Sequence, residues 1–235
     1  MLLYIFLFLL ISTIIFYIFN KNLDKYHFGR KTPNSINILI VGGTHGNEPS
    51  SSLSLYRLID YLKRKKIKNG FITIIPMINK TGFYTNNRYS NHFLENIDIN
   101  RNYPRKYHIN TLISSIIKDY DIVIDHHEGY NYHVNKKSSI GSTLSPLNFN
   151  TNLLTKILTK LNKHISDSNK KFIFNQTHKY PNGSLRNLIN DKYPNKKYLL
   201  IETTGITNRD KLETRQFKAL YIILSILLDK NVIKL

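Results

Sequence analysis

The chain contains no cysteine, and this absence excludes several classes of site. Without thiols there is no disulfide framework, no cysteine-ligated zinc ribbon, no iron–sulfur cluster and no thiol nucleophile. Any metal ion must therefore be held by His, Asp or Glu, and redox chemistry would need a cofactor. The cysteine content does not indicate a cellular compartment, because a chain without cysteine suits oxidising and reducing surroundings alike.

Acidic residues are also scarce, with 15 Asp and Glu against 34 Lys and Arg, which leaves a net charge of +19. This balance excludes an acidic calcium binder. The densest basic run, over residues 63–68, could contact nucleic acid or an anionic membrane, but a solvated helix end explains it more simply. Because no interleaved aromatic and basic motif accompanies it, we expect no specific nucleic-acid partner.

Charge is missing altogether from residues 1–20. Leu2 to Phe19 form an apolar run that would reach roughly 27 Å as a helix, close to the hydrocarbon thickness of a bilayer. The run lacks the basic start and the small-residue cleavage site of a signal peptide, so the sequence predicts an uncleaved transmembrane anchor over residues 1–20. Lys and Arg residues follow it at once, which predicts that the folded domain lies on the cytoplasmic side.

The rest of the chain has the length and the 41% hydrophobic content of one domain. We expect a linker over residues 21–35 and a single domain over residues 36–235. Hydrophobic patterning alternates between strand-like and helix-like periods, which predicts an α/β fold with a mostly parallel mixed sheet and helices on both faces. The expected strands lie near 36–41, 71–78, 122–124, 172–174 and 198–201, and the expected helices near 55–62, 113–117, 154–165 and 217–228.

Polar residues follow three of these strands, where sites of such folds collect. His45 and Glu48 lie in a glycine-rich turn, and two adjacent histidines, His126 and His127, close another strand. Two imidazoles and one carboxylate around Zn²⁺ leave a fourth position for water, which is the catalytic arrangement. Neighbouring strand residues point to opposite faces, so at most one of the two histidines is expected to be a ligand. Glu202 directly follows an apolar run, and a carboxylate there is expected to face a site.

Four segments, in this order, resemble the zinc carboxypeptidase superfamily, which includes the metallocarboxypeptidases and the succinylglutamate desuccinylase and aspartoacylase amidohydrolases. The segments are Gly-Gly-Thr-His-Gly-Asn-Glu at 42–48, Asp-Ile-Asn-Arg-Asn-Tyr-Pro at 98–104, Asp-His-His-Glu-Gly at 125–129 and Ile-Glu-Thr at 201–203. The resemblance implies a metallocarboxypeptidase-like fold. It also implies one Zn²⁺ per chain, with His45, Glu48 and His127 as its ligands.

The same resemblance implies roles for five further residues. Glu202 would be the general base, and Arg88 would polarise the scissile carbonyl. Asn100 and Arg101 would bind a substrate carboxylate, and Tyr180 would contact the substrate from its loop. The sequence departs from the family pattern at Lys80, where proline is usual, and at His126, where an aliphatic residue is usual.

Together these features predict a membrane-anchored zinc hydrolase that cleaves an amide bond next to a free carboxylate. The segment at 98–104 favours a metallocarboxypeptidase that removes a C-terminal residue from a peptide. The segment at 42–48 and the short chain instead favour a deacylase of N-acyl amino acids. A third reading is a non-catalytic, membrane-anchored binding module of the same fold, since function belongs to the site rather than to the fold.

Overall fold

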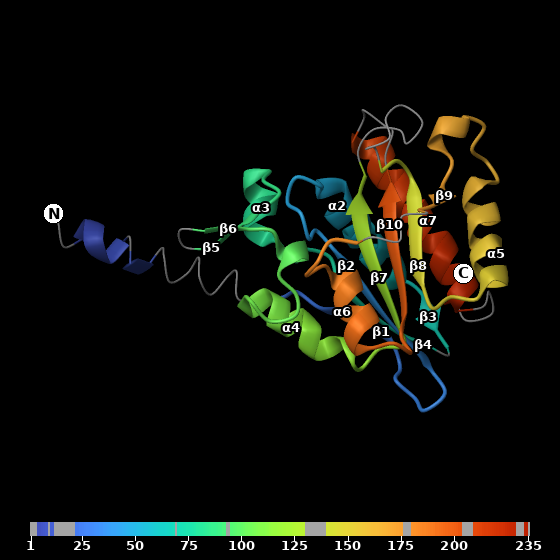
Figure 1. The fold of residues 1–235 in the computed structure, drawn as a ribbon, viewed down its shortest axis with the longest axis horizontal. Helices are drawn as coiled ribbons and strands as arrows, with labels where there is room; N and C mark the ends of the chain where they lie inside the picture. The colour runs from blue at the N-terminus through green and yellow to red at the C-terminus, as the bar shows by residue number, and fades with distance from the viewer. Residues whose placement is uncertain are drawn as a thin grey trace.

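The computed structural model describes residues 4–8, 10–11, 22–68, 70–92, 95–129, 140–175, 180–203, 209–228 and 233–234, and Figure 1 shows their arrangement. A seven-stranded sheet forms the centre. Its strands, in spatial order, are β1 (Tyr26–Gly29), β4 (Gly70–Ile75), β2 (Ile36–Gly42), β7 (Ile122–Glu128), β10 (Lys197–Thr203), β8 (Thr143–Leu147) and β9 (Ile173–Phe174). Strands β4, β2, β7 and β10 run parallel, whereas β1 and β8 are antiparallel to their inner neighbours. The predicted α/β fold with a mostly parallel mixed sheet is confirmed.

Helices pack on both faces of this sheet. They are α2 (Pro49–Leu62), α5 (Thr151–Asn162) and α7 (Arg209–Leu227) on one face and α4 (His108–Ile117) and α6 (Leu185–Lys192) on the other. A further helix, α3 (Lys80–Thr85), belongs to neither core cluster and packs against the turn at Gly46. Two short 3-10 helices lie at Ile99–Arg101 and Ser168–Lys170. Two small antiparallel sheets complete the described structure. One pairs β3 (Lys66–Ile67) with β11 (Ile233–Lys234), and the other pairs β5 (Ser90–His92) with β6 (Glu95–Ile97).

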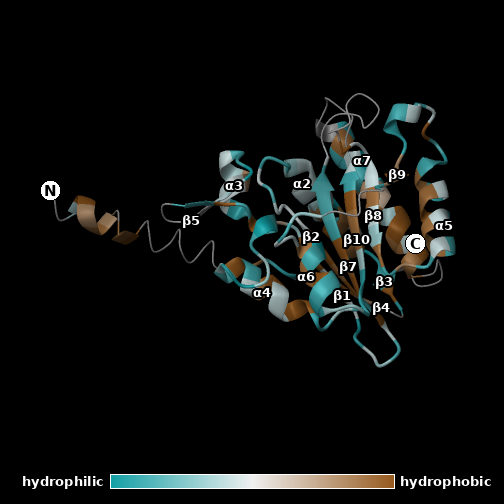
Figure 2. Cartoon of the chain, in the orientation of Figure 1, coloured by the Kyte–Doolittle hydropathy of each residue, from teal (hydrophilic) through white to brown (hydrophobic). Residues whose placement is uncertain are grey.

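The alternation of strand side chains divides the core into two apolar clusters. Ile38 and Ile40 of β2 point into a cluster with α2, α5 and α7, whereas Leu39 and Val41 point into a cluster with α4 and α6. Figure 2 shows β7 hydrophobic over its first half and hydrophilic toward its carboxyl end. The apolar halves of the central strands therefore hold the core, and the polar ends are left for a site.

Leu58 tests the cluster between α2 and α7, because its side chain is fully buried there. We expect Leu58→Ala to lower the free energy of unfolding by about 2–5 kcal/mol, the range for large-to-small changes in a core. Urea unfolding followed by circular dichroism measures it. Asp60→Ala on the same helix removes only an exposed ion pair with Lys63 and is expected to change stability by less than about 0.5 kcal/mol. Equal effects of the two substitutions would contradict this assignment of the core.

The predicted transmembrane anchor over residues 1–20 is corrected by the structure. Within that segment the structure describes helical residues at 4–8 and 10–11, with exposed apolar side chains. Of all the helices it describes, none has the length and apolarity needed to cross a bilayer. A spanning helix needs about 20 apolar residues in succession, and the helical stretches described in this segment, at 4–8 and 10–11, are far shorter. The predicted single-pass membrane localisation is therefore contradicted, and the cytoplasmic placement that depended on it loses its basis; the rest of the segment lies outside the described residues.

The sheet extends beyond the predicted strands: it includes β8, which the sequence did not predict, and β10 continues past 201 to Thr203. Strand β1 lies inside the predicted linker over residues 21–35 and pairs with β4 at the edge of the sheet. Strand β7 continues past the predicted 122–124 through Asp125 to Glu128, because its polar end is held by neighbouring strands. The division of the chain into domains stays a prediction.

Candidate active site

Three parallel strands end side by side at the place where the polar segments begin. β7 lies between β2 and β10, with Gly42 opposite His126 and Glu202 opposite His127. Residues that are far apart in the sequence therefore meet at the carboxyl edge of the sheet. Adjacent strands lie about 4.8 Å apart, so side chains that leave the same face of these strands converge on one small volume.

His45, Glu48 and His127 form the centre of this volume. The Nδ1 atom of His45 lies 2.6 Å from Glu48 Oε1, and the Nδ1 atom of His127 lies 2.8 Å from Glu48 Oε2. One candidate ligand atom from each residue falls within 4.8 Å of the others. The carboxylate thus bridges the two imidazoles, and all three present a donor atom to the same point.

The turn that carries His45 is fixed by close packing against α3. Gly46 approaches Gly82 so closely that an added Cβ atom would lie 1.9 Å from the carbonyl carbon of Gly82. The carbonyl groups of Gly42 and Gly43 accept hydrogen bonds from the backbone N–H groups of Ile78 and Asn79. A side chain at position 46 would displace the turn, so the glycine is required to place His45.

The two adjacent histidines of β7 have different surroundings, as strand alternation predicts. His127 faces Glu48, whereas His126 points to the other side of the sheet and lies 3.0 Å from the hydroxyl of Ser54 on α2. Burial lowers the pKa of His126 to about 3, so this imidazole is neutral at physiological pH. His126 therefore packs between β7 and α2 and takes no part in the cluster.

Each imidazole of the cluster has a second carboxylate behind it. His45 Nε2 lies 3.3 Å from Asp98 Oδ1, and His127 Nε2 lies 3.1 Å from Asp125 Oδ1. A carboxylate on the far nitrogen orients the ring and strengthens the near nitrogen as a ligand. The cluster thus has the outer partners that metal-binding histidines have in proteins.

Arg88 is anchored at the edge of the cluster by Asp98. Its Nε and Nη2 atoms donate hydrogen bonds of 3.1 and 3.0 Å to Asp98 Oδ2. Because both bonds go to this one oxygen, Nη1 is directed toward the cluster, 3.3 Å from His45 Nδ1 and 3.7 Å from Glu48 Oε1. The guanidinium therefore presents a fixed positive charge to the same volume as the imidazoles.

Glu202 lies across from His127 on β10 and is 8% exposed. Burial raises the pKa of Glu202 to about 8, and the Glu48 and Asp125 carboxylates act in the same direction, while His127 opposes them. A carboxyl group with a raised pKa next to other titratable groups is typical of a proton-transfer residue.

Electrostatic interactions inside the cluster are strong. Burial alone would raise the pKa of Glu48, but the His127 and His45 imidazoles hold it well below its usual range. Burial alone would lower the pKa of His127, but the Asp125 and Glu48 carboxylates raise it well above its usual value. The carboxylates therefore stabilise positive charge at this centre, which suits a bound cation.

Of the predicted substrate residues, Asn100 and Arg101 lie next to Asp98 at the edge of the cluster, whereas the structure does not bring Tyr180 into contact with the cluster among the described residues. Asn100 Oδ1 accepts a hydrogen bond of 2.9 Å from the backbone N–H of Leu185, which joins the segment at 98–104 to the start of α6. Arg101 is exposed and close enough to Asp98 to lower the pKa of that carboxyl. Tyr180 is half-buried, and its ring stacks on the guanidinium of Arg186 at 3.4 Å. Residues 176–179, which precede Tyr180 in its loop, lie outside the described residues.

The donor set fits Zn²⁺. It combines two imidazole nitrogens with one carboxylate, the set that leaves an open position in catalytic zinc sites. Buried imidazoles with carboxylates behind them also match the outer shell that such sites need. His45, Glu48 and His127 are therefore the residues that would hold the ion.

Asp98, Asp125 and Tyr198 are parts of this site to which the sequence assigned no role. Asp125 stands two residues before His127, so strand alternation places both on one face, and this spacing could have identified it. Tyr198 donates a hydrogen bond of 2.8 Å to Asp125 Oδ2. No spacing rule predicts that contact, because it joins two strands that are far apart in the chain.

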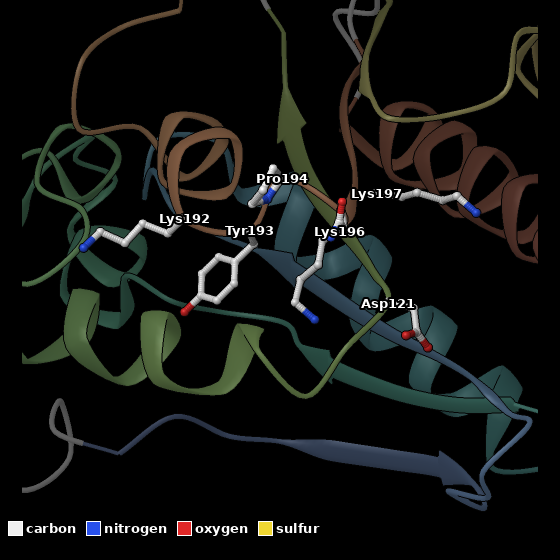
Figure 3. Close-up of a pocket in the computed structure, with 7 residues that line it drawn as sticks. Asp121, Lys192, Tyr193, Pro194, Lys196 and Lys197 are labelled. Atoms are coloured by element: carbon white, nitrogen blue, oxygen red, sulfur yellow. The ribbon is translucent and has the colours of Figure 1, made fainter.

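A surface pocket lies at the end of the sheet opposite the histidine cluster, where β7 and β10 begin (Figure 3). It encloses about 540 Å³ and is lined by Asp121, Lys192, Tyr193, Pro194, Asn195, Lys196 and Lys197. Lys196 donates a hydrogen bond of 2.8 Å to the carbonyl of Lys118, at the end of α4. This pocket is thus a junction between α4, α6 and the two strands, remote from the histidine cluster.

Comparison with known proteins finds one matching family model and several similar folds. Residues 34–131 match the succinylglutamate desuccinylase/aspartoacylase catalytic domain. The tripeptide-bound cell shape determinant Csd4 of Helicobacter pylori is similar, with a TM-score of 0.70 at 14% identity over 90% of this chain and 56% of Csd4. An mDAP-bound form of Csd4, described as a D,L-carboxypeptidase, gives 0.67 at 16% identity over 88% and 54%. An aspartoacylase family protein of Mesorhizobium loti gives 0.63 at 19% identity over 90% and 62%.

These matches confirm the predicted resemblance to the zinc carboxypeptidase superfamily. The structural likenesses show the fold, and the family match covers residues 34–131, less than half of the chain, which include His45, Glu48 and His127. No functionally curated protein matches the chain by sequence. The chain spans just over half the length of Csd4.

Proposed function

We propose that this protein is a zinc-dependent hydrolase that cleaves an amide bond next to a free carboxylate, and that it acts as a carboxypeptidase. The observation that carries the proposal is the convergence of His45, Glu48 and His127 at the carboxyl edge of the sheet, with Glu202 opposite His127. The family match and the fold support a hydrolase of the carboxypeptidase or deacylase type.

The chemistry divides between the ion and the protein. Zinc supplies Lewis acidity, which activates water and polarises a carbonyl group. Glu202, buried beside the ligands, would accept the proton of the attacking water on a carboxylate oxygen and deliver it to the nitrogen of the leaving amine. Arg88, fixed by Asp98, would place its Nη1, which faces the cluster, against the oxygen that gains negative charge.

The substrate carboxylate would bind at Asn100 and Arg101. Arg101 is exposed next to the site, and Asn100 is held in place by the N–H of Leu185. A guanidinium pairs with a carboxylate through two parallel charge-assisted hydrogen bonds, which fixes the orientation of the substrate as well as its position. The neighbour Csd4, described as a D,L-carboxypeptidase and solved with a bound tripeptide, supports a peptide substrate.

Arg101→Ala provides a direct test of this clamp. A hydrogen bond to a charged group contributes about 1.5–3 kcal/mol, so we expect kcat/KM on a peptide with a free C-terminus to fall by roughly 10- to 150-fold, mainly through KM. Exposed Arg105, four residues further along the chain, serves as the control, and Arg105→Ala is expected to leave kcat/KM unchanged. A loss of equal size for both variants would refute the assignment of Arg101.

The second candidate is a deacylase of N-acyl amino acids, which the match to the succinylglutamate desuccinylase/aspartoacylase catalytic domain favours. Both reactions need a carboxylate clamp and a metal-activated water, so the site alone serves either one. Assays of the zinc-loaded protein on peptides with free C-termini and on N-acyl amino acids separate the two. Turnover of N-acyl amino acids alone would establish the deacylase and overturn the carboxypeptidase.

A further inference from the structure

A buried chain of polar groups runs behind His127, away from the reaction site. His127 Nε2 lies 3.1 Å from Asp125 Oδ1, and the hydroxyl of Tyr198 donates a hydrogen bond of 2.8 Å to Asp125 Oδ2. The exposed fractions of Asp125, Tyr198 and His127 are 0%, 1% and 2%. All three belong to the central strands β7 and β10, so water has no access to compete for these contacts.

The carboxylate behind each histidine is held in a different way. Asp98, behind His45, is paired with the guanidinium of Arg88 through two hydrogen bonds, which offset its negative charge. Asp125, behind His127, instead accepts a hydrogen bond from the neutral phenol of Tyr198. A neutral donor fixes the position of a carboxylate and leaves its charge in place. In a buried site that charge acts strongly on the imidazole.

We propose that Tyr198 is a positioning residue for the metal centre, which acts through Asp125 to hold His127 with its Nδ1 atom directed at the ion. The inference rests on the proposed function, because it requires the metal centre. It assigns to Tyr198 a contribution to metal affinity, although Tyr198 does not touch the His45–Glu48–His127 cluster. Loss of an outer hydrogen-bonding residue that supports a metal-binding histidine typically lowers metal affinity 10- to 100-fold.

Two other tyrosines make matched controls. The hydroxyl of Tyr103 is buried and close enough to Asp125 to be affected by its charge, but it has no hydrogen-bond partner among the described residues. Tyr120 is buried in the same apolar cluster, and its hydroxyl donates a hydrogen bond of 2.7 Å to Thr73, away from the site. Tyr103→Phe thus tests proximity without a bond, and Tyr120→Phe tests the loss of a buried bond elsewhere.

The experiment measures zinc affinity of the full chain by competition with a chromogenic chelator, together with urea unfolding of the metal-free protein. Tyr198→Phe is expected to weaken zinc binding by about 10- to 100-fold and to change the visible absorption spectrum of the cobalt-substituted protein. Tyr103→Phe and Tyr120→Phe are expected to retain the affinity and the spectrum of wild type, even if Tyr120→Phe destabilises the fold as much as Tyr198→Phe does.

Asp125→Asn tests whether Tyr198 acts through Asp125. If it does, Asp125→Asn alone weakens zinc binding, and adding Tyr198→Phe causes little further loss, because the two changes break the same chain. Wild-type affinity in Tyr198→Phe, or fully additive losses in the double variant, would overturn the proposal while leaving the metal centre intact. Absence of zinc binding in wild type would instead overturn the proposed function, and this inference with it.

Discussion

Replacing Glu202 by Gln is expected to lower kcat by about 10² to 10⁴-fold, the usual contribution of a general base, while zinc remains bound. Glutamine keeps the size of the side chain but cannot take up a proton. Because Glu202 is not among the three residues whose ligand atoms cluster, the metal content should not change. The measurement is kcat on the best substrate among the peptides and N-acyl amino acids assayed above, together with elemental analysis of the same preparation.

A second glutamate makes the control for this substitution. Glu213 lies on α7, where it pairs with Arg57 at 3.5 Å, and Glu213→Gln is expected to leave kcat unchanged. Activity of the Glu202→Gln protein above about 1% of wild type would contradict the role of Glu202 as the base, because the loss of activity would then be smaller than the 10²-fold minimum expected. Loss of zinc along with activity would instead indicate that Glu202 helps to hold the ion.

The fold could be predicted because its central strands are continuous apolar runs and its long helices have clear stripes. Ile122, Val123 and Ile124 identified β7, but the pattern ended where Asp125 begins. The strand continues because the polar residues there find partners across the sheet, which a one-dimensional pattern does not contain. Strand β1 was missed for another reason: it is a four-residue edge strand with alternating, incomplete burial, and it carries little hydrophobic signal.

The ligand cluster could be predicted in outline because its members follow strands that end together. The motifs named His45, Glu48 and His127, and the structure brings these three together. Contacts such as Tyr198 with Asp125 depend on the lateral order of β7 and β10, and sequence spacing does not reveal that order. The predicted membrane anchor rested on hydropathy alone, and none of the helices among the described residues has the length and apolarity to cross a bilayer.

Replacing His127 by Ala is expected to abolish stoichiometric zinc binding, and His45→Ala is expected to do the same. Each substitution removes one of the three residues, His45, Glu48 and His127, that would hold the ion, and two remaining protein ligands do not make a tight site. A ligand that binds only the folded state at 100 times its Kd stabilises it by about 2.7 kcal/mol. Wild type should therefore melt at a higher temperature with zinc than without, and the two variants should show no such shift.

His126→Ala is the control, because His126 is adjacent to His127 in the chain and is just as buried, with exposed fractions of 0% and 2%. The substitution removes the contact with Ser54 and leaves a cavity, so the metal-free protein should be less stable. It removes no donor of the cluster, so one zinc per chain and the zinc-dependent rise in melting temperature should persist. If His126→Ala lost zinc and His127→Ala kept it, the two histidines would have exchanged roles. If wild type bound no zinc even when it is supplied, the hydrolase proposal would fall and a binding role would take its place.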